Sequence, residues 1–135
     1  MTTPPELPFV DEHAIAVAAT PERIWSVLQA YVERLTGSSH GMLFRMLGTV
    51  PRSAFEVVAS DPPREIALAG RHRFSTYRLV FRVEPDGDAV RLRALTFAVF
   101  PGSRGRAYRT VLMLSTGHVR ATRGMLRTVA RAAEE

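Results

Sequence analysis

The segment from residue 54 to residue 100 constrains the fold most strongly, because apolar and polar residues alternate through much of it. A period of two residues is typical of strands with one buried face. The alternation is interrupted at Asp61-Pro62-Pro63, at Gly70 and at Pro85-Asp86-Gly87, where proline and glycine favour reversals of the chain. We therefore predict four antiparallel strands, over residues 54–59, 64–69, 72–84 and 89–100.

A strand and a helix are predicted before this block. Residues 9–18 alternate, so that the odd-numbered side chains from Asp11 to Val17, His13 among them, share one face. Thr20 is a suitable N-cap and Pro21 a suitable first helical residue. The apolar residues that follow recur at helical spacing. The predicted core face comprises Ile24, Val27, Leu28, Tyr31 and Leu35, and Gly37 ends the helix.

Residues 104–133 allow two interpretations, a strand and a helix divided at Gly117, or one long helix. At about 100° per residue the apolar residues fall in one sector, and five arginines gather nearly opposite. This phase continues across Gly117, so we predict one long helix, with Gly117 as the place of any kink. The apolar sector holds Tyr108, Val111, Leu112, Val119, Leu126, Val129, Ala130 and Ala133. The basic side holds Arg109, Arg120, Arg123, Arg127 and Arg131.

Length and composition indicate one globular domain. The chain has 135 residues, of which 46% are hydrophobic, and it has no cysteine, which excludes disulfides and thiolate metal sites. Residues 1–8 are predicted to form a flexible tail and residues 9–135 the domain. Residues 38–52 fit either a short helix or an irregular strand. No apolar run is long enough for a membrane span, and no signal peptide precedes the domain, so we expect a cytoplasmic protein.

The net charge of +5 comes from a chain in which every basic residue is arginine. Such a composition is typical of a GC-rich genome, and without a nucleic-acid motif we predict no specific nucleic-acid partner. The four histidines show no zinc-binding spacing. No nucleophile, base and orienting group can be assembled, and no dinucleotide or phosphate loop is present. We therefore predict no metal, no cofactor and no assignable catalytic residue.

The order of elements, and the segment from Ala16 to Trp25 above all, resembles the START-like superfamily, also called SRPBCC or Bet v 1-like. A strand that runs into Ala-x-Pro-Glu-x-Ile-Trp, here with Thr20-Pro21-Glu22 at its centre, is similar to that superfamily's N-terminal signature. The resemblance implies an α+β helix-grip fold, a curved antiparallel sheet wrapped around a long C-terminal helix. It also implies a ligand cavity between sheet and helix. Members include lipid carriers and polyketide aromatases or cyclases, so fold alone does not settle function.

The register of the long hairpin decides which side chains line such a cavity. Pairing Val83 with Val90 brings apolar residues together on one face, whereas a slip of one residue would place arginines there. With this register the predicted ligand-binding residues from the sheet are Phe55, Val57, Tyr77, Leu79, Phe81, Leu92 and Thr96. From the helix they are Tyr108, Leu112, Ser115 and His118. His118 could orient a polar group of a ligand or act as a general base.

The same register leaves a second apolar group on the outer face of the sheet. A contiguous exposed patch of this kind would suggest a partner surface, and a homodimer in particular. A local bulge that rotates some of these residues inward is the alternative. The group comprises Phe74, Val80, Leu95, Phe97 and Val99.

Three functions follow, in order of preference. The first is a non-catalytic protein that binds a small hydrophobic or amphipathic ligand between the sheet and the C-terminal helix. The second is an enzyme of the polyketide aromatase/cyclase kind, with His118, Tyr77 and Arg73 as candidate acid–base groups. The third is an interaction module that uses the outer face of the sheet or the arginine stripe of the last helix.

Overall fold

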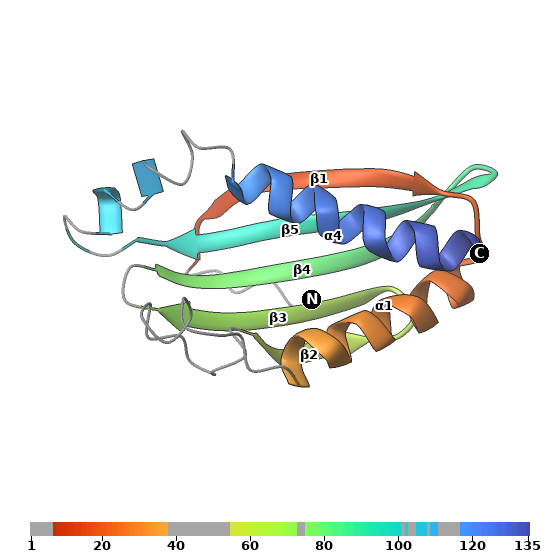
Figure 1. Cartoon of the computed structure of the whole chain (residues 1–135), viewed down its shortest axis with the longest axis horizontal. Coiled ribbons are helices and arrows are strands. Elements are labelled where there is room, and N and C mark those ends of the chain that lie inside the picture. The colour runs from red at the N-terminus through yellow and green to blue at the C-terminus, as the bar shows by residue number, and fades with distance from the viewer. Residues whose placement is uncertain are drawn as a thin grey trace.

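The computed structural model describes residues 7–37, 55–72, 75–100, 102, 105–107, 109–110 and 117–135. Two helices lie on one face of a curved sheet (Figure 1). The elements are β1 (Phe9–Val17), α1 (Pro21–Gly37), β2 (Glu56–Asp61), β3 (Glu65–His72), β4 (Ser75–Asp86), β5 (Ala89–Val99) and α4 (Gly117–Glu134). The predicted helix-grip arrangement is confirmed, whereas residues 38–52 lie outside the described part of the chain.

The sheet has five strands in the order β1-β5-β4-β3-β2, and every adjacent pair is antiparallel. The four strands predicted between residues 54 and 100 are present. β1 and β2 form the two edges of the sheet. Because β1 pairs with β5, the N-terminal strand lies at the edge of the sheet, beside the second strand of the long hairpin.

The predicted register of that hairpin is wrong by two residues. Val83 lies opposite Leu92 rather than Val90, and Asp86 lies opposite Ala89. The turn is therefore Gly87-Asp88, and Gly87 has a φ of 62°, which suits glycine. A shift by an even number of residues leaves every side chain on its face. The predicted inner face of β4 and β5 is consequently correct although the pairs are not.

The start of α1 agrees with the predicted capping pattern. The backbone N–H of Arg23 donates to Thr20 Oγ1 at 3.1 Å, and the N–H of Ile24 donates to the Thr20 carbonyl at 3.0 Å. Thr20 therefore satisfies a donor that the first turn of a helix leaves free. The core face also includes two residues that the periodicity did not single out, Trp25 and Val32.

The C-terminal helix is shorter than predicted. α4 begins at Gly117, and the helical residues 105–107 and 109–110 belong to short pieces beyond the end of the sheet (Figure 1). The predicted helix from Arg104 is therefore wrong in its starting point, although the phase of its C-terminal part is correct. Within α4 the buried residues include Leu126, Val129, Ala130 and Ala133, and the exposed ones include Arg120, Arg123, Arg127 and Arg131.

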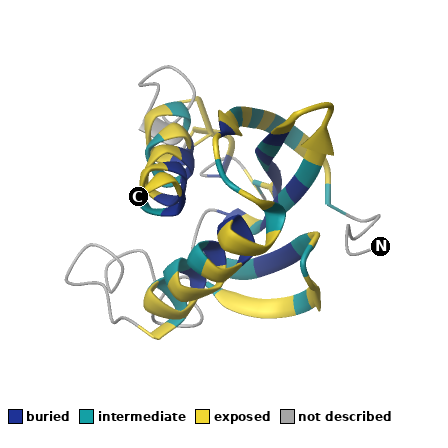
Figure 2. Ribbon diagram, turned by 90° about the vertical axis from the view of Figure 1, so that its right-hand side faces the viewer, coloured by how far each residue is buried: buried dark blue, intermediate teal, exposed yellow. Residues whose placement is uncertain are grey.

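The main core fills the space between the helices and the inner face of the sheet. Phe81 on β4, Leu92 on β5 and Leu28 on α1 are completely buried there, and Leu126 of α4 packs with them. Buried residues gather where the helices face the sheet (Figure 2). Burial of these side chains supplies the main driving force for the layered arrangement.

The outer face of the sheet carries a second, smaller core rather than an exposed patch. Val80, Leu95 and Phe97 are at most 8% exposed and pack with Leu7. The Ala98 N–H donates to the Pro8 carbonyl at 2.9 Å, which holds this N-terminal segment against the sheet. The prediction of an exposed patch is therefore wrong for these three residues. Of the other two, Val99 is 40% exposed and Phe74 lies outside the described residues.

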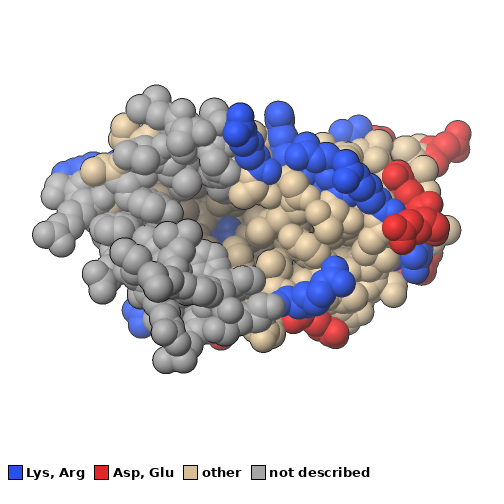
Figure 3. Space-filling model, viewed as in Figure 1, with Lys and Arg blue, Asp and Glu red and all other residues tan. Residues whose placement is uncertain are grey.

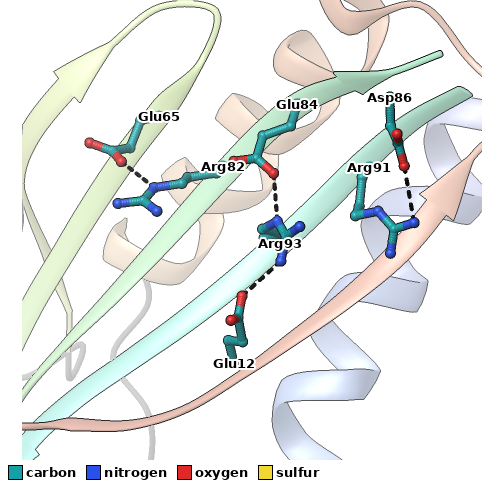
Figure 4. Close-up of polar contacts among 7 residues, drawn as sticks. All are labelled: Glu12, Glu65, Arg82, Glu84, Asp86, Arg91 and Arg93. Carbon is teal, nitrogen blue, oxygen red and sulfur yellow. Dashed lines mark hydrogen bonds and ion pairs between the residues drawn. The ribbon is translucent and has the colours of Figure 1, made fainter.

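The rest of the outer face is covered by ion pairs between neighbouring strands (Figure 4). Arg93 on β5 binds both Glu84 on β4 and Glu12 on β1, the latter at 2.9 Å. These hydrogen bonds raise the pKa of Arg93 above its usual value, and the bond to Glu84 contributes more than the bond to Glu12. Arg82 and Glu65 form a similar pair at 2.6 Å. Cross-strand pairs of opposite charge fix the register on a face that the helices leave bare.

Within the described residues, no helix is both long and apolar enough to cross a membrane.

Replacing Thr20 by alanine tests whether Thr20 stabilises α1 as its N-cap. We expect Thr20→Ala to lower the free energy of unfolding by about 1 kcal/mol, because the Arg23 N–H loses its acceptor. Urea unfolding followed by circular dichroism measures the change. Thr128→Ala is the matched control: its hydroxyl donates to the Gly124 carbonyl on an exposed part of α4, and alanine is the better helix former. Equal losses in the two variants would contradict the capping role.

Candidate functional site

The two helices are tied together at one end of the sheet. The Arg23 guanidinium of α1 donates to the carbonyls of Ala132 at 3.0 Å and Ala133 at 3.4 Å, in the last turn of α4. The Ala18 N–H donates to the Glu134 carboxylate at 2.9 Å. A cation at a helix C-terminus satisfies free carbonyls and opposes the negative end of the helix dipole. This end of the molecule is therefore closed.

At the opposite end of the sheet the helices diverge (Figure 1). We call this the open end; it holds the beginnings of β1 and β4 and the ends of β3 and β5. The molecular surface is hollowed between the two helices on this side (Figure 3).

The inner face of the sheet changes from apolar to polar toward the open end. Polar residues lie toward this end on three neighbouring strands, and on β5 the polar Thr96 is followed on this face by Ala98. From the closed end to the open end, the inner-face residues are Val17, Ile15, His13 and Asp11 on β1, Val90, Leu92, Ala94, Thr96 and Ala98 on β5, and Val83, Phe81, Leu79, Tyr77 and Ser75 on β4. A polar surface that faces the interior needs hydrogen-bond partners.

Thr96 is the most informative of these residues. It lies between Asp11 of β1 and Leu79 of β4 and is 8% exposed. Within the described part of the chain, its Oγ1 is the one buried side-chain oxygen or nitrogen without a hydrogen-bond partner. Burying a hydroxyl in this way costs about 1–3 kcal/mol. The protein thus keeps an unused donor and acceptor buried near the open end of the inner face.

Asp11 and His13 form a polar pair beside Thr96. The two residues are two positions apart on β1, so their side chains share one face. His13 Nε2 lies 3.2 Å from Asp11 Oδ2. The Asp11 side chain is 25% exposed and the His13 side chain is 15% exposed. Because a carboxylate can only accept, Nε2 carries the proton in this hydrogen bond, and Nδ1 of the neutral imidazole is the acceptor. The pair therefore holds an imidazole in one orientation at the inner face.

Tyr77 and Phe55 form the aromatic side of the open end. Their rings meet edge to face, with centroids 5.5 Å apart and planes inclined at 71°. In the sheet Tyr77 lies between Gly70 on β3 and Ala98 on β5. These neighbours are small, so the sheet places no large side chain beside the Tyr77 ring.

The predicted ligand-binding residues occupy three kinds of position. Leu79, Phe81 and Leu92 lie in the main core and are at most 6% exposed. Phe55, Tyr77 and Thr96 come together at the open end, whereas Val57 on the edge strand β2 is 45% exposed. The four helix-side predictions, Tyr108, Leu112, Ser115 and His118, have side chains outside the described part of the structure.

Sequence reasoning gave little weight to the Asp11–His13 pair. The signal was present, since Asp-x-His in a strand places both side chains on one face. Its significance came from the neighbouring strand, which brings Thr96 opposite Asp11. Among the described residues, no three histidine or acidic side chains lie close enough together to hold a metal ion.

Comparisons with known proteins identify the fold. No family model and no curated protein sequence matches the chain. The ZhuI aromatase/cyclase from Streptomyces sp. R1128 is similar in structure, with a TM-score of 0.60 and 16% identity over 96% of this chain and 94% of that chain. A conserved protein from Geobacillus kaustophilus gives a TM-score of 0.57 and 14% identity over 90% and 93% of the two chains.

The Aha1 dimer from Colwellia psychrerythraea is also similar, with a TM-score of 0.55 and 15% identity over 91% of this chain and 94% of that chain. The protein thus has a helix-grip fold, as the sequence resemblance implied. At sequence identities this low, the structural similarity establishes the fold, and function has to be argued from the site.

Thr96→Val tests whether the buried Thr96 hydroxyl lacks a hydrogen-bond partner. We expect this isosteric change to raise the free energy of unfolding by about 1 kcal/mol, because it removes a buried polar atom without a partner. Thr122→Val on α4 is the matched control, since Thr122 is 3% exposed and its side chain does have a partner. That variant is expected to lose stability. If Thr96→Val destabilised the protein as much as Thr122→Val, the hydroxyl would have a partner within the fold.

Proposed function

We propose that the protein binds a small amphipathic molecule between the sheet and the helices, with the polar group of the ligand at the open end. The unpaired Thr96 hydroxyl carries this proposal. A ligand hydroxyl or carbonyl supplies the missing partner, and Asp11 and His13 offer further hydrogen bonds beside it.

The apolar part of the ligand lies against Tyr77, Phe55 and the neighbouring core surface. Affinity comes mainly from apolar burial, at about 25 cal/mol per Å² before the costs of ordering are subtracted. The polar groups contribute less to affinity and more to orientation, because each hydrogen bond replaces one made with water. No catalytic step is required for this role, which is the first of the three functions inferred from the sequence.

An acid–base enzyme of the aromatase/cyclase kind is the second candidate. The observation that favours it is the oriented imidazole of His13, whose Nδ1 is an acceptor while Asp11 holds Nε2. Such a group can take a proton from carbon next to a ketone, which is the first step of an aldol ring closure. The fold similarity to ZhuI agrees with this candidate without adding a residue to it. Incubation with a poly-β-ketone thioester separates the two candidates, since an enzyme accelerates or redirects ring closure relative to a protein-free control and a binding protein does not accelerate it.

Two further predictions remain proposals. A homodimer through the outer face now depends on Phe9 and Val99, which are 56% and 40% exposed, because the larger apolar residues of that face are buried. Light scattering of the purified protein measures the oligomeric state. The second proposal is the cytoplasmic location that the sequence predicts.

A pair of ligands that differ by one hydroxyl tests the proposed function. Naphthalene and 2-naphthol bury nearly the same apolar area, and only 2-naphthol can pair with Thr96. We expect 2-naphthol to bind about tenfold more tightly, the worth of one well-placed hydrogen bond. In Thr96→Val this difference should shrink to less than about twofold, while naphthalene binding is retained. Isothermal titration calorimetry measures the four affinities.

The control is Thr122→Val, which should keep the preference for 2-naphthol because Thr122 lies on α4 and outside the polar group of the sheet. Native mass spectrometry of the purified protein, followed by denaturing extraction, identifies any molecule that copurifies. The proposal fails if neither compound binds, or if the preference for 2-naphthol survives in Thr96→Val.

A further inference from the structure

A second concave site lies outside the grip, in the seam between α4 and the edge of the sheet. It is an open groove of about 400 Å³. Its wall on the sheet side is the run of β1 from Glu12 to Ile15. Its other wall is formed by Arg123, Leu126 and Arg127 of α4. The volume lies within the range of sites that hold small ligands or short peptide segments.

The groove follows the free edge of β1. Successive side chains of a strand point to opposite faces, yet four consecutive residues, from Glu12 to Ile15, line the same groove. Only a groove along the edge of the strand can touch both sets. In the described part of the sheet β1 pairs with β5 alone, so the backbone N–H and C=O groups on its other side have no strand partner. An edge of this kind is a template for an added strand.

The charge of the groove is set by the two arginines. Glu12 is paired with Arg93 on the outer face, and His13 is paired with Asp11. Arg123 and Arg127 are exposed and make no ion pair with any residue in the described ranges. Two like charges four residues apart destabilise a helix, and a bound anion relieves that repulsion. The groove therefore favours a negatively charged occupant.

The spacing of the arginines matches a strand and not merely an anion. Residues four apart on an α-helix are separated by about 6 Å along its axis. Alternate residues of a strand, which share one face, are separated by about 6.6 Å. Acidic side chains at positions i and i+2 of an extended peptide would thus each meet one arginine, while the peptide backbone pairs with the edge of β1.

We propose that this groove, which we call the edge groove, binds an extended acidic peptide segment of another protein as an added strand beside β1. The intervening residues of the peptide face away from α4, so the recognition pattern is acidic residue, any residue, acidic residue. Backbone pairing provides affinity and the two arginines select the sequence, as in other modes of strand addition. The groove lies at the edge of the sheet and the amphipathic ligand lies inside the grip, so this proposal does not depend on the proposed function.

Fluorescence anisotropy with a labelled peptide that alternates glutamate and valine tests the proposal at low ionic strength. We expect saturable binding to the wild-type protein. The double variant Arg123→Ala/Arg127→Ala should bind about tenfold more weakly, the effect of two exposed charge-assisted contacts. The matched control is Arg120→Ala/Arg131→Ala, which removes the same charge from the same helix outside the groove and should bind as the wild type does.

Two further peptides separate strand addition from simple attraction between charges. A peptide of identical composition in which pairs of glutamates alternate with pairs of valines has no two glutamates at positions i and i+2, and it should bind more weakly. A peptide N-methylated at alternate backbone nitrogens cannot pair with β1 and should not bind. The proposal is overturned if the alternating peptide does not bind, if both double variants lose affinity equally, or if the methylated peptide or free glutarate binds as well as the alternating peptide.

Discussion

The contact between Arg23 and the last carbonyls of α4 fixes the end of the sheet at which the two helices meet. The inner face of the sheet is apolar over most of its length and has to be covered. Two helices provide the cover, and the guanidinium of one holds the C-terminus of the other. Because the helices meet at one end, they diverge toward the other (Figure 1).

The distribution of polar residues follows from this arrangement. At the closed end every inner-face residue can be apolar, since no molecule other than the protein contacts it. At the open end three strands present polar groups inward, and one of them, the Thr96 hydroxyl, lacks a partner among the described residues. A residue that lowers stability in the free protein and gains a partner on binding is typical of functional sites. The fold thus keeps an unpaired buried hydroxyl at the end of the sheet where we propose that the ligand lies.

The parts of the structure that follow from local chemistry were predictable, and those that depend on distant contacts were not. Thr20 as N-cap and the faces of the strands follow from nearby residues. The hairpin register was missed because Asp86-Gly87 and Gly87-Asp88 are both acceptable two-residue turns, and they give the same faces. Burial of the outer apolar group depends on Leu7, a residue far away in the sequence. The open-end group was found only in part, because the strand pairing that joins Asp11 to Thr96 is not visible in either strand alone.

The structure is explained most simply if the protein binds its ligand at the open end of the inner face, as we propose. Amide chemical-shift mapping of the isotope-labelled protein during titration with 2-naphthol tests this most directly. We expect the largest shifts at Asp11, Tyr77 and Thr96, with little change at Val17, Val83 and Val90 at the closed end. Shifts concentrated at the closed end, on the outer face, or at Ala14, Arg123 and Arg127 of the edge groove would contradict this proposal.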